Sequence, residues 1–281
     1  MRLLFIILSL FLTLTAFGQV DSLCFRNKDK AKNLTINGLK EGVWCDKLRY
    51  YELGSFDTNG RYNYRIGAYK TGKPIGVFKE YNDKGIVINE MPFVDGKLDG
   101  VEKQYDRFDG KLETEAPYKQ GKENGIEKWY QDNGRIGRET PYVNGLKTGV
   151  MKSYDEDGKL MSEATFVNGK ENGYERDYDD SGKCYRETPF VNDTISGIEK
   201  WYYDDGKLQG EDPFVHDKVN GVERFYYESG KIQSETPFVD NIRNGVQKEY
   251  YENGKLKYEK TYVDNTVIST KNYDENGNEI K

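Results

Sequence analysis

The stretch GIEKWYYDDGKLQGEDPFV, residues 197–215, contains two runs of alternating apolar and polar residues on either side of a turn sequence. Alternation with a period of two is typical of a β-strand with one buried face. The Asp205-Gly206 dipeptide between the runs supplies the positive backbone φ angle that a tight hairpin turn needs. The stretch therefore predicts a β-hairpin.

The same pattern recurs along most of the chain. Each unit begins at a glycine followed by Val, Ile or Tyr, and units follow one another every 24 residues, with one step of 25 where the turn at residues 107–110 is longer. The units start at Gly76, Gly100, Gly125, Gly149, Gly173, Gly197, Gly221 and Gly245. Self-similarity at a fixed period indicates a repeat architecture. We therefore expect an all-β fold, an elongated antiparallel β-meander built from hairpin repeats of about 24 residues.

The first residues, MRLLFIILSLFLTLTAFGQV, have the pattern of a secretory signal peptide: Arg2, an apolar stretch at residues 3–14 and a small-residue exit with cleavage after Gly18. No later apolar segment approaches membrane length, so we expect no transmembrane segment after signal cleavage. The mature chain is then exported, to the periplasm, the cell surface or the medium of a bacterium. The predicted divisions are a signal peptide at 1–18, an N-terminal cap with degenerate repeats at 19–75, and eight repeats plus a truncated C-terminal repeat at 76–281.

The composition excludes several classes of protein. Of the 281 residues, 36% are hydrophobic, so we expect no single large core, yet 14% are aromatic, which argues against disorder. The net charge of −6 argues against nucleic acid as a partner, because no excess of cations exists to displace counterions. The single histidine, His216, argues against His-rich metal sites and Ser-His-Asp triads. His216 itself replaces the Asn or Asp of a connecting turn, so we expect an exposed loop residue.

The register of each hairpin decides which side chains are buried. The second position of each unit holds Val, Ile or Tyr and the sixth holds Tyr, and these share one face. A bulged three-residue turn places Leu208 and Phe214 on that face, whereas a two-residue turn points them the other way and sets Lys200 opposite Glu211. We expect the bulged turn, because burying an apolar side chain contributes about 1.5–3 kcal/mol against about 0.2–1 kcal/mol for a cross-strand pair. Pro213 and its equivalents predict that the return strand is interrupted into two half-strands.

The repeat resembles a known family. Residues 250–259, YYENGKLKYE, and 166–173, FVNGKENG, are similar to the bacterial variant of the MORN (membrane occupation and recognition nexus) repeat found in proteins labelled YwqK-family antitoxins. The resemblance covers about residues 40–281. It implies an elongated repeat-built β-sheet that acts by binding, and the antitoxin label implies a protein partner.

The cysteines leave two possibilities open at the N-terminal end. Cys24 and Cys45 either form a disulfide that staples the cap or stay unpaired, since sequence cannot fix connectivity. Cys184 occupies the position that Leu208 holds in its own unit, so we expect it to be a buried apolar residue rather than a reactive thiol.

The many carboxylates occupy the shared hairpin turn, as in Asp204-Asp205-Gly206, and their spacing fits no full calcium loop. A ladder that repeats one environment also provides no pair of acids in different environments for acid–base catalysis. We therefore expect no enzyme activity, no metal and no cofactor.

Aromatic residues are the candidate binding residues. They fall on the face opposite the valines, at the fifth position (Trp129, Trp201, Phe225) and at the seventh (Tyr203, Tyr227, Tyr251). Such a stripe anchors a protein or stacks on sugar rings, unless the sheet covers it by curling or dimerising. The sequence thus favours a non-enzymatic exported scaffold that binds a protein partner. The alternative is a glycan- or envelope-binding module, for which coplanar rings beside carboxylates would be needed.

Overall fold

The computed structural model describes residues 34–49, 51–52, 55–56 and 62–280. The predicted signal peptide and Cys24 lie outside these residues, and the predicted domain boundaries stay predictions. The chain divides into two compact units, Met1–Gly134 and Arg135–Lys281. Every regular element in the described ranges is a strand, and none of their residues form a helix long and apolar enough to cross a membrane.

The strands of the N-terminal unit are β1 (Leu34–Ile36), β2 (Leu39–Arg49), β3 (Tyr51–Glu52), β4 (Ser55–Phe56), β5 (Tyr62–Lys70), β6 (Lys73–Tyr81), β7 (Val87–Val94), β8 (Lys97–Leu98), β9 (Gly100–Tyr105), β10 (Leu112–Lys119), β11 (Lys122–Glu123) and β12 (Gly125–Tyr130). Those of the C-terminal unit are β13 (Ile136–Val143), β14 (Leu146–Lys147), β15 (Gly149–Tyr154), β16 (Leu160–Val167), β17 (Lys170–Tyr178), β18 (Cys184–Val191), β19 (Thr194–Ile195), β20 (Gly197–Tyr202), β21 (Leu208–Val215), β22 (Lys218–Val219), β23 (Gly221–Tyr226), β24 (Ile232–Val239), β25 (Ile242–Arg243), β26 (Gly245–Tyr250), β27 (Leu256–Val263), β28 (Thr266–Tyr273) and β29 (Glu279–Ile280).

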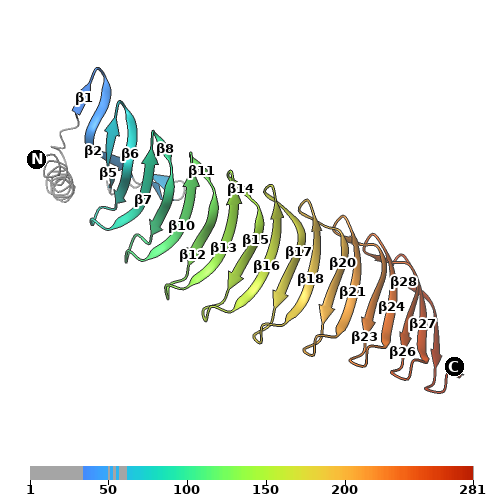
Figure 1. Cartoon of the computed structure of the whole chain (residues 1–281). Coiled ribbons are helices and arrows are strands. Elements are labelled where there is room, and N and C mark those ends of the chain that lie inside the picture. Colours follow the sequence, from blue (N-terminus) through green and yellow to red (C-terminus); the bar gives the residue numbers. More distant parts are fainter. Residues whose placement is uncertain (1–33, 50, 53–54, 57–61, 281) are drawn as a thin grey trace, which may run out of the picture. The chain divides into compact units, whose positions relative to one another are not determined.

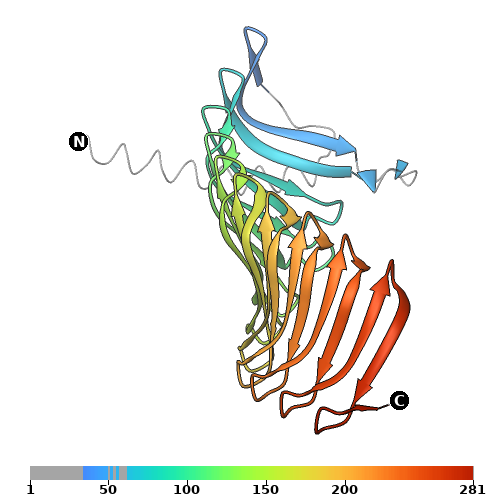
Figure 2. The same ribbon diagram turned by 90° about the vertical axis from the view of Figure 1, so that its right-hand side faces the viewer.

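Within each unit the strands pair antiparallel, hairpin after hairpin in chain order (Figure 1). The predicted all-β fold of antiparallel hairpin repeats is confirmed. The strands of the C-terminal unit, green to red in Figure 2, form one layer. Because no second layer of described residues lies on that sheet, both of its faces meet solvent.

The hairpin turns form as their dipeptides predict. In the turn between β20 and β21, the Gly206 N–H donates to the Tyr203 carbonyl at 2.7 Å, and the Tyr203 N–H donates to the Lys207 carbonyl at 2.8 Å. Gly206 has a φ of 83°, which a residue without Cβ adopts without strain. The connecting turns are also left-handed, as at Asn144 and Gly145, whose φ angles are 53° and 86°. Both kinds of turn therefore follow from local chemistry.

The predicted bulged turn is confirmed, and it places Leu208 on the face of Tyr202, but the predicted register of the rest of the return strand is wrong. Tyr202 lies opposite Leu208, but Trp201 lies opposite Gly210, so Gln209 is an extra residue in a second bulge that follows the turn. This second bulge reverses the alternation once more. As a result Phe214 lies opposite Gly197, on the face of Trp201, and the valine-type residues do not share a face with it.

The observed register sets a basic residue opposite a glutamate in the middle of most hairpins. Ion pairs of this kind join Lys79 to Glu90 at 3.0 Å, Lys103 to Glu115 at 2.8 Å, Arg176 to Glu187 at 2.7 Å and Arg224 to Glu235 at 3.1 Å. We call the face that carries these pairs, together with the second and sixth positions, the valine face, and the other one the tryptophan face. In a single layer no other element covers the valine face. Burial of apolar side chains therefore cannot favour a different register over the one that forms the ion pairs.

Few apolar side chains of the described residues are fully buried. They are Tyr64, Ile66, Phe78, Tyr81, Met91, Ala116, Ala164 and Tyr262. Tyr64, Ile66 and Tyr81 form a small cluster in the N-terminal unit, where Val43 and Cys45 pack against them. The expectation that no large core exists agrees with this distribution.

The prolines do not interrupt their own strand, so the prediction that the return strand is divided into two half-strands is wrong. Pro213 lies within the continuous strand β21, opposite Ile198. The following strand is the divided one, into β22 and β23, and at that break the Asn220 N–H donates to the Pro213 carbonyl at 2.8 Å. The proline therefore stands where its missing N–H is not needed.

Candidate functional site

An apolar stripe runs along the valine face of the C-terminal unit. Its first row holds the second-position residues and its second row holds the valine that ends each return strand. The members exposed by 42–51% are Val143, Val150, Val167, Tyr174, Val191, Ile198, Val215, Val239, Val246 and Val263. We call this set the valine stripe.

The pairing of the strands places both rows side by side. Ile198 lies opposite Pro213, and Val215, two residues further along β21, projects on the same face because side chains alternate along a strand. The same relation holds for Tyr174, Pro189 and Val191 in the preceding hairpin. Most repeats therefore contribute two exposed aliphatic or aromatic side chains next to a proline or threonine, and the repeat that begins at Gly221 contributes one, because Val222 is half-buried.

The N-terminal unit has its own shorter version of the stripe. Val77, Val94, Val101 and Ile126 are exposed by 45–51%. Lys119 takes the place that Val215 holds in the C-terminal unit, and its Nζ pairs with Asp99 at 3.0 Å. A lysine at this position is thus compatible with the hairpin.

The polar rows beside the stripe are held in place. The Tyr202 hydroxyl donates to Glu187 Oε2 of the preceding hairpin at 2.8 Å, and the Arg176 guanidinium donates to Glu187 Oε1 at 2.7 Å. Burial of the Tyr178 ring, followed by its hydrogen bond to Glu163 at 2.8 Å, raises the pKa of Tyr178 to about 12. These contacts hold the polar side chains beside the stripe in place and pair their charges.

Two of the predicted aromatic residues come together on the tryptophan face. The rings of Trp201 and Phe225 stack with centroids 6.4 Å apart and an interplanar angle of 24°. Gly210 lies opposite both residues, and a Cβ there would lie 2.9 Å from Phe225 Cε1 and 3.2 Å from Trp201 Cε3. The missing side chain of Gly210 makes room for the ring pair, which is half-buried.

The three seventh-position tyrosines join neighbouring repeats. Their hydroxyls donate to main-chain carbonyls one repeat further on, Tyr203 to Tyr226 at 2.6 Å, Tyr227 to Tyr250 at 2.6 Å and Tyr251 to Tyr273 at 2.9 Å. All three side chains are half-buried. Their hydroxyls therefore have a structural role, and their predicted binding role stays a prediction.

Trp129 belongs to the N-terminal unit and is 43% exposed. It lines a pocket of about 300 Å³ together with Phe108, which is 74% exposed. Trp129 therefore belongs to a site within the N-terminal unit.

Carboxylates follow one another beside the Trp201–Phe225 pair. Asp212 lies opposite Glu199, and Glu223 follows in the next hairpin. Burial, followed by the charge of Glu223, raises the pKa of Asp212 to about 7. Burial also raises the pKa of Glu223, whereas Glu199 accepts a hydrogen bond from the Thr188 hydroxyl at 2.7 Å. We call Glu199, Asp212 and Glu223 the carboxylate row, and this row can take up a proton near neutral pH.

The comparisons with known proteins identify the repeat. The family model described as MORN repeat variant matches residues 147–168, 195–216, 219–240 and 243–264. This chain carries MORN-variant repeats. All four matches lie in the C-terminal unit, whose hairpins also carry the valine stripe.

No curated protein matches the chain. Among solved structures, a crystal structure titled TcdB2-TccC3-Cdc42 matches with 15% identity and a TM-score of 0.17. The match covers 86% of this chain and 15% of that chain, and at this TM-score it supports no inference.

The remaining predicted residues have structural surroundings. The Cys184 thiol donates to the Arg186 carbonyl at 3.3 Å, and burial raises its pKa, which disfavours the reactive thiolate. His216 is exposed in a connecting turn of a MORN-variant repeat. The Cys24–Cys45 disulfide stays a prediction. No group of three or more metal-binding side chains that could hold an ion occurs in the described part of the chain.

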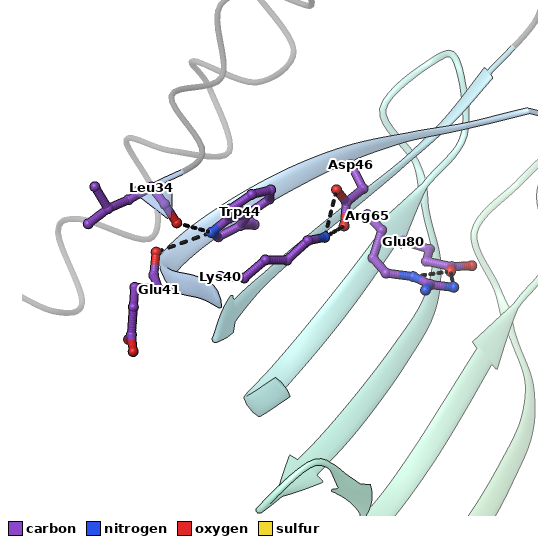
Figure 3. Close-up of polar contacts among 7 residues, drawn as sticks. All are labelled: Leu34, Lys40, Glu41, Trp44, Asp46, Arg65 and Glu80. Atoms are coloured by element: carbon purple, nitrogen blue, oxygen red, sulfur yellow. Dashed lines mark hydrogen bonds and ion pairs between the residues drawn. The ribbon is translucent and has the colours of Figure 1, made fainter. Parts of the chain in front are cut away.

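Trp44 shows how the first hairpins tie down an aromatic residue. Its Nε1 donates to the carbonyls of Leu34 and Glu41, both at 3.1 Å (Figure 3). The Lys40 ammonium lies 4.4 Å from the centroid of the Trp44 ring and binds the Asp46 carboxylate at 3.2 Å. These contacts hold the indole inside its hairpin.

Sequence reasoning missed the valine stripe because it assigned the second-position residues to a buried face and gave the valine that ends each return strand no role. The sequence shows these residues at every repeat, but it does not show that no second layer covers them. It also missed Phe108, although the one longer hairpin turn marks that position in the sequence.

Proposed function

We propose that this chain is an exported, non-enzymatic scaffold that binds a protein partner through the valine stripe of its C-terminal unit. The observation that carries the proposal is the repeated exposure of one or two apolar side chains per hairpin on one face. Contiguous exposed apolar surface of this kind marks interaction sites in soluble proteins. MORN repeats suggest a protein that acts by interaction, and the antitoxin label of similar proteins supports an antitoxin-like mode of partner binding.

A protein surface fits the stripe better than a lipid surface does. Membrane-binding faces combine apolar residues with an excess of Lys and Arg. Here the charges beside the stripe are paired, as in Arg176–Glu187 and Arg224–Glu235, and the whole chain has a net charge of −6. An apolar surface with balanced polar neighbours is instead typical of a protein–protein interface.

The test is affinity capture of the full chain from its native cells, followed by reconstitution with the purified protein that is captured. The variant Val167→Lys/Val191→Lys/Val215→Lys places lysine where Lys119 occurs naturally. The matched control, Met161→Lys/Tyr185→Lys/Gln209→Lys, adds the same charge to the same three repeats at exposed sites where Lys257 occurs naturally. We expect the stripe variant to lose the partner and the control to keep it. Equal binding by both variants would rule out the stripe.

A second candidate function is favoured by one observation, the stacked Trp201–Phe225 pair beside Glu199 and Asp212. Aromatic rings next to carboxylates are suited to stacking on sugars and binding their hydroxyls. The measurement is retention of the full chain on insoluble envelope polysaccharide. Retention that Trp201→Ala abolishes and the triple stripe variant leaves unchanged would replace the protein-binding function by glycan binding.

A further inference from the structure

The hairpin turn between β9 and β10 is longer than the turns of the other repeats. The Gly110 N–H donates to the Asp106 carbonyl at 2.9 Å, four residues back, whereas the equivalent bond of Gly206 spans three. Asp106 Oδ1 accepts hydrogen bonds from the main-chain N–H groups of Phe108 and Asp109, both at 2.7 Å. The extra residue and these bonds hold the main chain at Phe108, whose side chain is exposed.

Beside this turn lies the pocket of about 300 Å³. Its walls include the rings of Phe108 and Trp129, which are 74% and 43% exposed. Glu113, the bulge residue of β10, and Asp132, from the turn after β12, also line it. The pocket therefore combines two accessible aromatic rings with carboxylates from two hairpins.

The charges of the pocket are not balanced from within. The Lys111 ammonium binds the Asp109 carboxylate at 3.2 Å and the Asp132 main-chain carbonyl at 3.2 Å. In the described part of the chain, neither the Glu113 nor the Asp132 carboxylate takes part in an ion pair. Burial, followed by the charges of Asp106, Asp109 and Asp132, raises the pKa of Glu113. Negative charge thus accumulates where a ligand can enter.

We propose that this pocket binds the guanidinium group of an arginine on the partner protein, an inference that rests on the proposed function for the source of that arginine. A guanidinium is attracted to the faces of Trp and Phe rings and forms paired hydrogen bonds with carboxylates. A neutral sugar would leave the charges of Glu113 and Asp132 uncompensated, and an anion would be repelled by them. Arginine is also more weakly hydrated than lysine, which favours its transfer into a pocket.

The test is a titration of the full chain with the blocked peptide Ac-Gly-Arg-Gly-NH2, followed through the indole N–H signals of the three tryptophans. Trp129→Phe assigns the Trp129 signal. We expect that signal to shift saturably while those of Trp44 and Trp201 stay in place, and we expect the lysine and glutamine analogues of the peptide to bind more weakly. Binding should also weaken as salt is added, because it depends on charge.

The variant Glu113→Gln/Asp132→Asn should bind the arginine peptide about tenfold more weakly than wild type. The control Asp204→Asn/Glu228→Gln removes two charges from hairpin turns of the C-terminal unit and should bind as wild type does. No shift of the Trp129 signal, or equal shifts with the glutamine peptide, would overturn the proposal. A shift caused by a neutral oligosaccharide and not by the arginine peptide would overturn it in favour of a sugar site.

The same variants separate this proposal from the proposed function. If the purified partner binds Glu113→Gln/Asp132→Asn as tightly as wild type, the arginine site is wrong and the scaffold function stands. If the arginine peptide binds but the valine-stripe variant keeps every captured protein, the pocket stands as an arginine site and the stripe is wrong.

Discussion

At the scale of single residues, side-chain hydrogen bonds between repeats take the place of a core. In the C-terminal unit a sixth-position tyrosine donates to the glutamate of the preceding hairpin, as Tyr202 does to Glu187 and Tyr226 to Glu211. The seventh-position tyrosines add a bond to the next repeat, as between Tyr203 and the Tyr226 carbonyl. The hairpins that begin at Gly197, Gly221 and Gly245 are thereby bonded to both neighbours through their tyrosines.

Removing one hydroxyl from this ladder should destabilise the protein measurably. We expect Tyr202→Phe to lower the free energy of unfolding by about 1–2 kcal/mol, because the Glu187 carboxylate loses a half-buried donor. Urea denaturation followed by circular dichroism measures the change. The control is Tyr185→Phe, whose side chain is 45% exposed and whose loss of a hydroxyl should change the stability by less than about 0.5 kcal/mol.

The carboxylate row makes stability depend on pH. The pKa of Asp212 is about 7 in the folded chain against an ordinary value of 3.8, so the folded state binds a proton that the unfolded state releases between these values. The free energy of unfolding should therefore rise as the pH falls from 8 to 5. Below about pH 4.5 it should fall again, because Arg176 and Tyr202 outweigh burial and hold the pKa of Glu187 below its usual range.

The substitution Asp212→Asn tests the first part of this pH profile. It should stabilise the protein at pH 8 by about 1 kcal/mol and reduce the gain between pH 8 and pH 5.5, since no proton is then needed at this position. Urea titrations at the two pH values give the comparison. An unchanged pH dependence in the variant would show that the titrating group lies elsewhere.

At the scale of the element, the junction between hairpins is built from a glycine and a proline. Gly221 has a φ of 134°, and a Cβ there would lie 2.8 Å from Pro213 Cγ. Gly125 and Pro117 have the same relation, with 2.7 Å. At the junction before Gly173 the proline is replaced by Thr165, whose Cβ takes up the same place at 2.9 Å. The glycine is thus required at the junction and the proline is exchangeable.

We expect Gly221→Ala to destabilise the C-terminal unit by about 2–3 kcal/mol, because it combines a left-handed backbone with a steric clash. Pro213→Thr, which copies Thr165, should cost less than about 1 kcal/mol. Thermal unfolding of both variants provides the comparison. If the two substitutions proved equally mild, the junction would not depend on its glycine.

The hairpins could be predicted from the sequence, but which side chains of the two strands share a face could not. Dipeptides such as Asp205-Gly206 fix the turn locally, and the positions of the strands follow from them. The bulge at Gln209 has no such local signal, since Met161 and Tyr185 occupy the same place in other repeats. The predicted register assumed that apolar side chains would be buried, and in a single layer the Lys–Glu and Arg–Glu pairs decide it instead.

At the scale of the whole molecule, each of the two compact units presents apolar residues on its valine face. This distribution explains why the composition contains many aliphatic and aromatic residues while few side chains of the described residues are buried. The candidate binding site is therefore the valine stripe and not the predicted set of aromatic residues. Of the predicted aromatic residues, Trp201 and Phe225 form a stacked pair, Trp129 lines a pocket, and the tyrosines at 203, 227 and 251 join repeats. Ile198 was assigned to a buried face from the sequence, and Val215 was given no role.

The most direct test of the central claim, that the valine stripe contacts a protein, is site-specific photo-crosslinking in the native cells. Benzoylphenylalanine would replace Val215 in one variant and Gln209, at the far end of the same strand, in the other. We expect a protein adduct from position 215 that the added substitutions Val167→Lys/Val191→Lys abolish, and no adduct from position 209. An adduct from position 209 alone, or no protein adduct from position 215, would contradict the account.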